Sequence, residues 1–137
     1  MTMLGMRHLA LNVSDPQRSK DFYTRVLGMQ VEWEPDADNV YLTSEGQDNL
    51  ALHKLPSQAG APAAPQALDH LGFVLARIDD VDQWYKRVKS YGIAIVNELK
   101  THRDGARSFY FRDPDGILIQ IIYHPPIAQA SARPPKP

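Results

Sequence analysis

The chain has 137 residues, a formal net charge of -1 and no cysteine. The lack of cysteine excludes disulfides, thiolate metal sites and cysteine nucleophiles. The near-neutral charge, without any basic run, argues against a nucleic acid or an anionic membrane as partner. Because 43% of the residues are hydrophobic and no apolar run reaches membrane-spanning length, we expect a soluble globular protein in the cytoplasm.

The first half of the chain predicts one strand, one helix and three further strands. An apolar strand covers residues 6–13, and a helix then begins at Pro16 with Ser14 or Asp15 as its N-cap. Gly28 ends this helix. Apolar runs between turn-rich segments predict the three strands, at residues 29–33, 39–43 and 49–55.

The second half repeats this order after a linker. Residues 56–67 are rich in Pro, Ala, Gly and Gln and lack periodicity, which is typical of a linker. The elements predicted next are a strand at 68–75, a helix that is capped at Asp79 and Asp80 and runs to Tyr91, and a strand at 93–96.

Residues 107–124 predict a β-hairpin. Two runs of β-branched and aromatic residues flank Asp113-Pro-Asp-Gly116, in which proline presets one turn residue and glycine accepts a positive φ. Gln120 interrupts the second run, which is otherwise almost wholly apolar. A buried amide without a partner costs about 1–3 kcal/mol, so the partner of Gln120 bears on function.

The two halves match as an internal repeat. An offset of 62 residues places His8 on His70, and both predicted helices contain Tyr-x-Arg-Val. We therefore predict two βαβββ modules, at residues 1–55 and 68–124. The tail, residues 125–137, contains five prolines and is predicted to be extended or disordered, although its first residues can lie against the sheet.

The repeat also predicts a cluster of imidazole and amide groups. Equivalent residues of paired modules converge near a pseudo-twofold axis, which would bring His8 and His70 together. Strand alternation turns His53 and Gln120, in the last strand of each module, to the same inner face. Neutral donors of this kind suit a divalent ion such as Fe²⁺, Mn²⁺, Ni²⁺ or Zn²⁺. Without a carboxylate the ion keeps its full charge, so we expect weaker metal binding but stronger Lewis acidity towards an anionic substrate.

Four segments carry a family resemblance: Arg7-His-Leu-Ala-Leu-Asn-Val13, Phe22-Tyr-Thr-Arg-Val-Leu-Gly-Met29, Leu68-Asp-His-Leu-Gly-Phe73 and Asp113-Pro-Asp-Gly116. They resemble the vicinal oxygen chelate superfamily, whose members include glyoxalase I, extradiol dioxygenases, fosfomycin-resistance enzymes and bleomycin-binding proteins. The resemblance implies an α+β fold of two paired βαβββ modules, which form a cup-shaped mixed sheet with the helices on its outer face. It also implies a divalent metal ion that an oxygen-bearing substrate chelates.

The second half is most similar to extradiol dioxygenases. That resemblance implies metal ligands at His8, His70 and Gln120, with Gln120 in place of the usual glutamate. In a glyoxalase-like arrangement His53 is a fourth ligand. By the same resemblance His102 would transfer protons and Tyr110 would stabilise developing negative charge. The departure at Gln120 weakens the case for oxygen activation, because a carboxylate normally tunes the iron for that chemistry.

Three functions follow as hypotheses. The leading one is a metal-dependent, extradiol-dioxygenase-like enzyme that acts on a small aromatic or otherwise oxygen-chelating substrate. A glyoxalase-type lyase or isomerase is the alternative on the same fold, and a metal-free protein that binds a small molecule such as a drug is the third. A purely structural role is the competing interpretation for His70, Gln120 and Tyr110. We expect a homodimer, with the modules paired within one chain or exchanged between chains.

Overall fold

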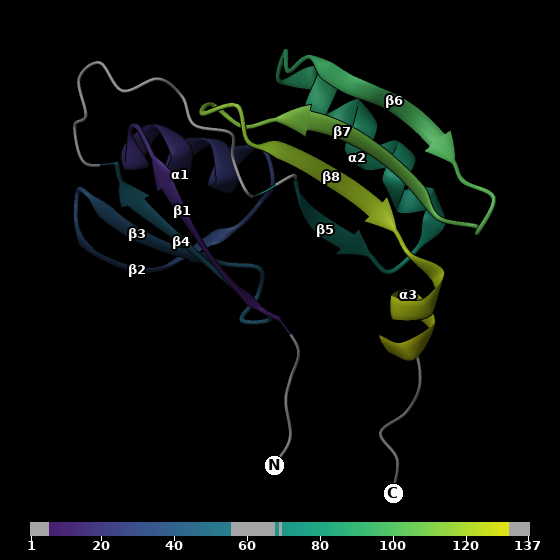
Figure 1. Ribbon diagram of the computed structural model, residues 1–137, viewed down its shortest axis with the longest axis horizontal. Coiled ribbons are helices and arrows are strands. Elements are labelled where there is room, and N and C mark those ends of the chain that lie inside the picture. The colour runs from purple at the N-terminus through teal and green to yellow at the C-terminus, as the bar shows by residue number, and fades with distance from the viewer. Residues whose placement is uncertain (1–5, 56–67, 69, 132–137) are drawn as a thin grey trace, which may run out of the picture. The chain divides into compact units, whose positions relative to one another are not determined.

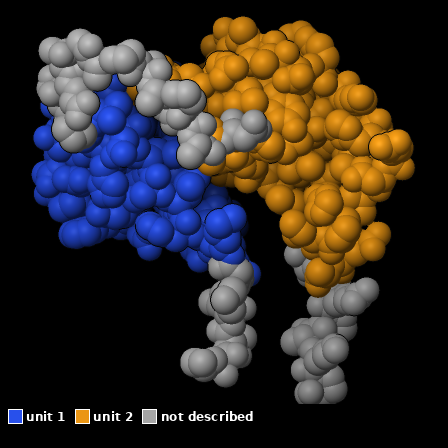
Figure 2. All heavy atoms as spheres, viewed as in Figure 1, with its two compact units in different colours: residues 1–64 blue, residues 65–137 orange. Residues whose placement is uncertain are grey.

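The chain divides into two units, and each is built from one βαβββ module (Figure 1). The computed structural model describes residues 6–55, 68 and 70–131. Unit 1 is Met1–Ala64 and unit 2 is Pro65–Pro137, shown in blue and orange in Figure 2. The predicted linker lies outside the described residues. In the part of the chain that is described, no helix is long and apolar enough to cross a bilayer.

Unit 1 contains a four-stranded mixed sheet and one helix, as the α+β prediction requires. Its strands lie in the order β1-β4-β3-β2, with β1 and β4 parallel and the other two pairs antiparallel. The elements are β1 (His8–Val13), α1 (Pro16–Arg25), β2 (Gln30–Asp36), β3 (Asn39–Thr43) and β4 (Asn49–Lys54).

Helix α1 begins and ends as the sequence predicts. Asp15 is the N-cap, and its carboxylate accepts hydrogen bonds from the backbone N–H groups of Gln17 and Arg18. Gly28 adopts a φ of 74° past the end of the helix, where its N–H donates to the Thr24 carbonyl. Local sequence signals therefore determine both ends of α1.

Helix α1 covers one face of the unit 1 sheet. It contacts β3 and β4, and four alternating side chains of these strands are buried: Val40, Leu42, Leu50 and Leu52. Because successive side chains of a strand point to opposite faces, Tyr41 and His53 lie on the face away from α1. We call that side of each sheet, away from its covering helix, the open face.

Unit 2 repeats this arrangement. Its strands lie in the order β5-β8-β7-β6, with β5 and β8 parallel and the other pairs antiparallel. The elements are β5 (Leu71–Leu75), α2 (Ile78–Ser90), β6 (Ile95–Thr101), β7 (Arg107–Arg112), β8 (Leu118–Tyr123) and α3 (Pro125–Ser131).

Helix α2 is held to the unit 2 sheet by packing and by one ion pair. Phe109 and Ile119 are fully buried, and the Tyr85 ring meets the Phe109 ring edge-on with centroids 5.4 Å apart. Arg107 of β7 forms two hydrogen bonds, of 2.9 and 2.7 Å, to the Asp82 carboxylate of α2. Hydrogen bonding from Arg107 lowers the pKa of Asp82 below its ordinary value.

The predicted β-hairpin is confirmed. Strands β7 and β8 are antiparallel neighbours, and Gly116 adopts a φ of 83° in the turn between them. The Asp113 side chain is buried and accepts hydrogen bonds from the backbone N–H groups of Asp115 and Ile117. This Asx-type turn sets the register of β8 and therefore the face on which Gln120 lies.

Two predictions for unit 2 need correction. Arg77, rather than Asp79 or Asp80, is the N-cap of α2, and it makes no side-chain capping bond. The two aspartates lie within the first turn, where their charges complement the helix dipole. Strand β6 also extends to Thr101, five residues beyond the predicted end at Val96.

The prediction that residues 125–137 are disordered is wrong for their first half. Residues Pro125–Ser131 form helix α3, and the His124 carbonyl accepts hydrogen bonds from the N–H groups of Ile127 and Ala128. Both prolines occupy the first turn, where a missing N–H breaks no helical hydrogen bond. Ala128 is buried, and α3 contacts β5. Residues 132–137 lie outside the described part of the chain.

Candidate functional site

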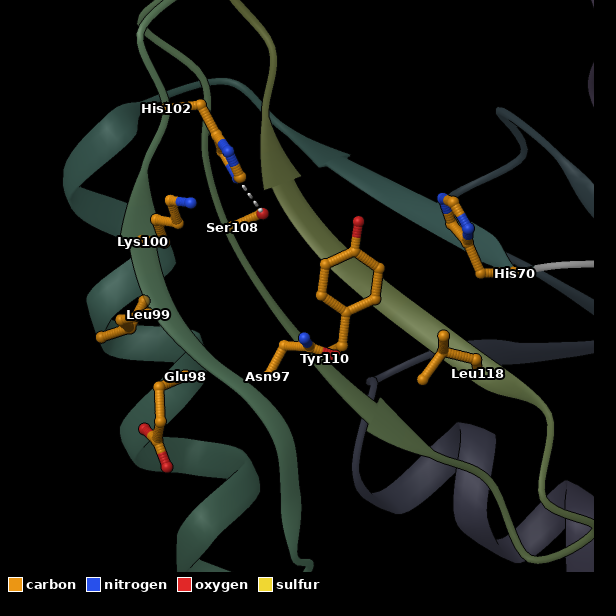
Figure 3. A pocket seen from close by; sticks show the side chains of 9 residues that line it. All are labelled: His70, Asn97, Glu98, Leu99, Lys100, His102, Ser108, Tyr110 and Leu118. Atoms are coloured by element: carbon orange, nitrogen blue, oxygen red, sulfur yellow. Dashed lines mark hydrogen bonds between the residues drawn. The ribbon is translucent and has the colours of Figure 1, made fainter.

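A pocket lies on the open face of the unit 2 sheet (Figure 3). Its volume is about 660 Å³, and its lining includes His70, Lys100, His102, Ser108, Tyr110 and Leu118. Three of the predicted site residues, His70, His102 and Tyr110, therefore line one pocket. They come from the residue just before β5, the loop after β6 and the middle of β7.

Tyr110, Gln120 and Gly72 form a row across the middle of this open face. In the strand register Tyr110 pairs with Gln120, and Gln120 pairs with Gly72. The Tyr110 ring also meets the His70 ring edge-on, with centroids 5.5 Å apart. Tyr110, a predicted catalytic residue, is thus a neighbour of His70 and Gln120, the predicted metal ligands of unit 2.

The Gln120 side chain is half-buried and, among the described residues, makes no hydrogen bond to protein. A Cβ atom added at Gly72 would lie 3.9 Å from Gln120 Oε1, so the absence of a side chain there leaves the amide uncrowded. Buried amides are normally satisfied by protein groups. An amide that is neither fully buried nor bonded internally is available to a ligand.

The loop that carries His102 is held by local hydrogen bonds. The His102 N–H donates to the Ala106 carbonyl at 2.7 Å, and the Gly105 N–H donates back to the His102 carbonyl at 3.0 Å. The imidazole Nε2 lies 3.1 Å from the hydroxyl of Ser108, which is buried. His102 is therefore a held, half-buried side chain and not a freely exposed loop residue.

Two charged side chains line the pocket, Glu98 and Lys100, and they differ in whether another protein group already binds their charge. The Glu98 carboxylate accepts a hydrogen bond from the Tyr85 hydroxyl and points away from the pocket space in Figure 3. Lys100, in contrast, makes no ion pair within the described ranges and lies beside His102. The charge that this pocket offers to a ligand is therefore positive.

Unit 1 presents His8 on its own open face. His8 Nδ1 lies 2.7 Å from Asn49 Oδ1, and the Asn49 amide nitrogen donates in turn to the Glu32 carboxylate. Because Asn49 pairs with His8 in the strand register, the contact is built into the sheet. Sequence reasoning missed Asn49 and Glu32, since they are far apart in the chain and follow no motif.

The prediction that His53 is the counterpart of Gln120 is wrong. In unit 2 Gln120 pairs with Gly72, two residues after His70, whereas in unit 1 the residue in that position is Ala51, which pairs with Ala10. His53 pairs with Asn12, four residues along from His8. At about 3.3 Å per residue their backbones are about 13 Å apart along the sheet, so the two side chains stand over different parts of the open face. His53 instead contacts Asn39 and Tyr41.

The donors suit a metal, but neither unit completes a metal site by itself. Over the ranges described, no three His, Asp or Glu side chains are grouped to hold an ion. What each unit offers is a neutral donor set, with His8 in unit 1 and His70 with Gln120 in unit 2. Imidazole nitrogen and amide oxygen are chemically suited to borderline divalent ions.

The fold, the internal repeat and the site residues together describe a small protein that is built from two βαβββ modules. A family model, described as the Glyoxalase/Bleomycin resistance protein/Dioxygenase superfamily, matches residues 5–121. This chain belongs to that superfamily, which confirms the resemblance predicted from its sequence.

Individual relatives differ in what they do. The chain is 31% identical over 119 residues to glutathione transferase FosA of Serratia marcescens, covering 85% of this chain and 79% of that protein. It is 26% identical over 124 residues to a 2,2',3-trihydroxybiphenyl dioxygenase of Sphingomonas paucimobilis, covering 87% of this chain but 41% of the enzyme. Lactoylglutathione lyase of Agrobacterium tumefaciens shares the fold, with a TM-score of 0.73, 21% identity and coverage of 90% and 96%.

Proposed function

We propose that this protein is a divalent-metal-dependent enzyme that acts on a small oxygen-chelating substrate, with His8, His70 and Gln120 as metal ligands. The observation that carries the proposal is the unbonded amide of Gln120, which shares the open face with His70 and Tyr110. The amide is open to solvent and has no protein hydrogen-bond partner among the described residues, so a ligand can reach it. A ligand role explains why an amide interrupts an apolar strand.

The neutral donor set indicates the kind of chemistry. When bound, the ion would act as a Lewis acid that polarises a substrate oxygen. Because His and Gln bring no negative charge, the ion would attract an anionic substrate more strongly than an ion bound by a glutamate would. Lys100, on the pocket wall, adds positive charge. We therefore infer a substrate that carries a carboxylate, phosphonate, phenolate or enolate oxygen.

Tyr110 and His102 are the proposed catalytic residues. The Tyr110 hydroxyl projects into the pocket, where it would donate a hydrogen bond to an oxygen that becomes negative during reaction (Figure 3). His102 would hold or move a proton at the other end of the pocket, with Ser108 fixing its ring. Neither role requires a carboxylate base.

An extradiol dioxygenase is the second candidate. The observation that favours it is the gathering of His70, His102 and Tyr110 in one pocket, as the resemblance to those enzymes implies. The dioxygenase relative is more than twice as long as the matched segment. By the resemblance to extradiol dioxygenases, Gln120 also replaces a glutamate ligand. We therefore place Lewis-acid chemistry first.

The test is metal content. Protein purified without chelator and then supplied with Fe²⁺, Mn²⁺, Ni²⁺ or Zn²⁺ should bind about one equivalent by elemental analysis. His8→Ala and His70→Ala should abolish this binding. His53→Ala is the matched control, because it removes an imidazole from the same open face as His8 but should keep the metal.

The other outcomes discriminate among the alternatives. If wild type takes up no metal, the proposal fails and a metal-free small-molecule binding protein replaces it. If metal binds, oxygen uptake with catechols would identify the dioxygenase, and isomerisation of hemithioacetals the glyoxalase-type enzyme. The homodimer stays a prediction that light scattering on the full chain checks.

A further inference from the structure

Two networks on the open face of unit 1 share one pattern, in which a histidine contacts an asparagine and the asparagine contacts a carboxylate. The first runs from His8 through Asn49 to Glu32, with 2.7 Å between the imidazole and the amide oxygen. The second runs from His53 through Asn39 to Asp36, with distances of 2.7 and 2.9 Å. The pattern is the same, but only the first network begins at a proposed metal ligand.

The carboxylate determines the direction of every hydrogen bond in the first network. An ionised carboxylate only accepts, so the amide NH₂ of Asn49 faces Glu32. The amide oxygen then faces His8, and it can only accept, so His8 Nδ1 carries the hydrogen. The imidazole is thereby left with its lone pair on Nε2. A lone pair on a fixed nitrogen is what a metal ligand needs.

The backbone places Glu32 for this contact. A register shift between Val31 and Trp33 leaves Glu32 as an extra residue in the pairing of β2 with β3. Such bulges redirect a side chain, and Glu32 reaches past β3 to Asn49 at the start of β4. The Asn49 N–H also donates to the Arg7 carbonyl at 2.8 Å, which ties β4 to the chain just before His8.

We propose that Asn49 and Glu32 are positioning residues for His8, which hold its Nε2 lone pair towards the metal and supply a negative charge one amide beyond the ligand. The inference rests on the proposed function, in which His8 is a ligand. It also provides negative charge near a ligand set that has none, because Gln120 replaces a glutamate. The ligands themselves are neutral, and the Glu32 carboxylate is linked through Asn49 to one of them, His8.

The experiment has a metal-free arm and a Zn²⁺ arm. In the metal-free arm, long-range ¹H–¹⁵N spectra at about pH 8, where model histidines are neutral, report the tautomer of each imidazole, and His8→Ala assigns the His8 signals. Wild type should show hydrogen on Nδ1. Asn49→Ala should shift His8 towards the other tautomer, while Asn39→Ala, the matched control, should move only the His53 signals.

In the second arm Zn²⁺ is titrated against a competing chelator. Asn49→Ala and Glu32→Gln should weaken Zn²⁺ binding by about 10–100-fold, the usual effect of removing the partner of a ligand. Asn39→Ala should leave it at the wild-type value. The double variant Glu32→Gln with Asn49→Asp exchanges the two side-chain types. The new carboxylate at 49 still accepts from His8 Nδ1, so tautomer and affinity should both be restored.

The two proposals fail in different ways. Hydrogen on Nε2 in wild type, or unchanged Zn²⁺ affinity in Asn49→Ala, would overturn the positioning roles while leaving His8 as a ligand. Wild type that takes up none of Fe²⁺, Mn²⁺, Ni²⁺ and Zn²⁺ would overturn the proposed function, and with it any role of these residues towards a metal.

Discussion

The two tyrosines on the middle strands, Tyr41 and Tyr110, occupy equivalent positions in surroundings of opposite character. Tyr110 pairs with Gln120 and contacts the His70 ring. Tyr41 pairs with Ala51 instead and is stacked on Trp33, with ring centroids 5.1 Å apart. One module frame therefore holds a polar pocket in unit 2 and an aromatic stack in unit 1. The difference teaches that the frame sets positions, while a single cross-strand partner decides what a position can do.

The largest expected effect comes from removing the hydroxyl of Tyr110, and the comparison is with the same change at Tyr41. Tyr110→Phe should lower kcat by about 10²–10³-fold, the usual loss when a hydrogen-bond donor to a developing oxyanion is removed. Tyr41→Phe, the matched control, should leave kcat within about twofold, because Tyr41 pairs with Ala51 and stacks on Trp33 instead of lying beside a proposed ligand. Steady-state kinetics on the assigned substrate measures both. Equal losses in the two variants would remove Tyr110 from the catalytic role.

A second prediction concerns Gln120, the cross-strand partner of Tyr110. Gln120→Glu should tighten Zn²⁺ binding by about tenfold or more, because a carboxylate neutralises one unit of the ion's charge. The same change should weaken the binding of an anionic substrate to the loaded protein. Competition with a chelator measures the metal affinity. An unchanged value would place Gln120 outside the ligand set.

Lys100 tests whether the positive charge of the unit 2 pocket selects the substrate. Lys100→Gln should raise KM for an anionic substrate by about 3–10-fold with little change in kcat, the expected result for a partly screened charge. The effect should shrink as salt is raised. Lys54→Gln, on the exposed end of β4 in unit 1, is the control. A kcat loss without a KM change would indicate a role in the chemical step.

The smallest effect concerns the stability contributed by an ion pair in unit 2. Asp82→Asn removes the ion pair with Arg107 and should lower the free energy of unfolding at neutral pH by about 0.5–1 kcal/mol, because the pair is partly exposed. Since the folded-state pKa of Asp82 is lowered, the stabilisation exists above the ordinary aspartate pKa and is lost as the pH falls through the folded value.

Urea unfolding curves for wild type and Asp82→Asn should therefore differ at pH 7 and converge as the pH falls through the lowered folded-state pKa of Asp82. Asp21→Asn, which removes the exposed ion pair with Arg25 within α1, is the control in unit 1 and should have a smaller effect. A difference that grows at acidic pH would contradict the assignment of the ion pair.

Local signals made most of the fold predictable. Asp15, Gly28 and the turn from Asp113 to Gly116 each act within a few residues, and the structure uses all of them as predicted. The family and the open-face positions of Gln120 and Tyr110 followed from the same kind of evidence. The register between strands that lie far apart in the sequence could not be predicted. A one-residue slip reverses the face of a strand, but a two-residue slip keeps it.

His53 was misplaced for this reason. Its face was predicted correctly, and only the register showed that the repeat offset grows from 62 residues at Ala10 and Gly72 to 69 at Ala51 and Gln120. The contact between Glu32 and Asn49 depends on a bulge, which leaves no periodic signal. Helix α3 was missed because five prolines outweighed a short helical segment in a composition-based prediction.

The start of α3 has a practical consequence for work on this protein. Pro125 lies against Gly105, where an added Cβ would meet the proline ring at 3.5 Å, and Gly105 belongs to the loop that holds His102. A chain shortened after Tyr123 to remove the proline-rich end would take away this support. Relaxation measurements should then show microsecond-to-millisecond exchange at the His102 loop, and a truncated protein would underestimate the activity of the whole chain.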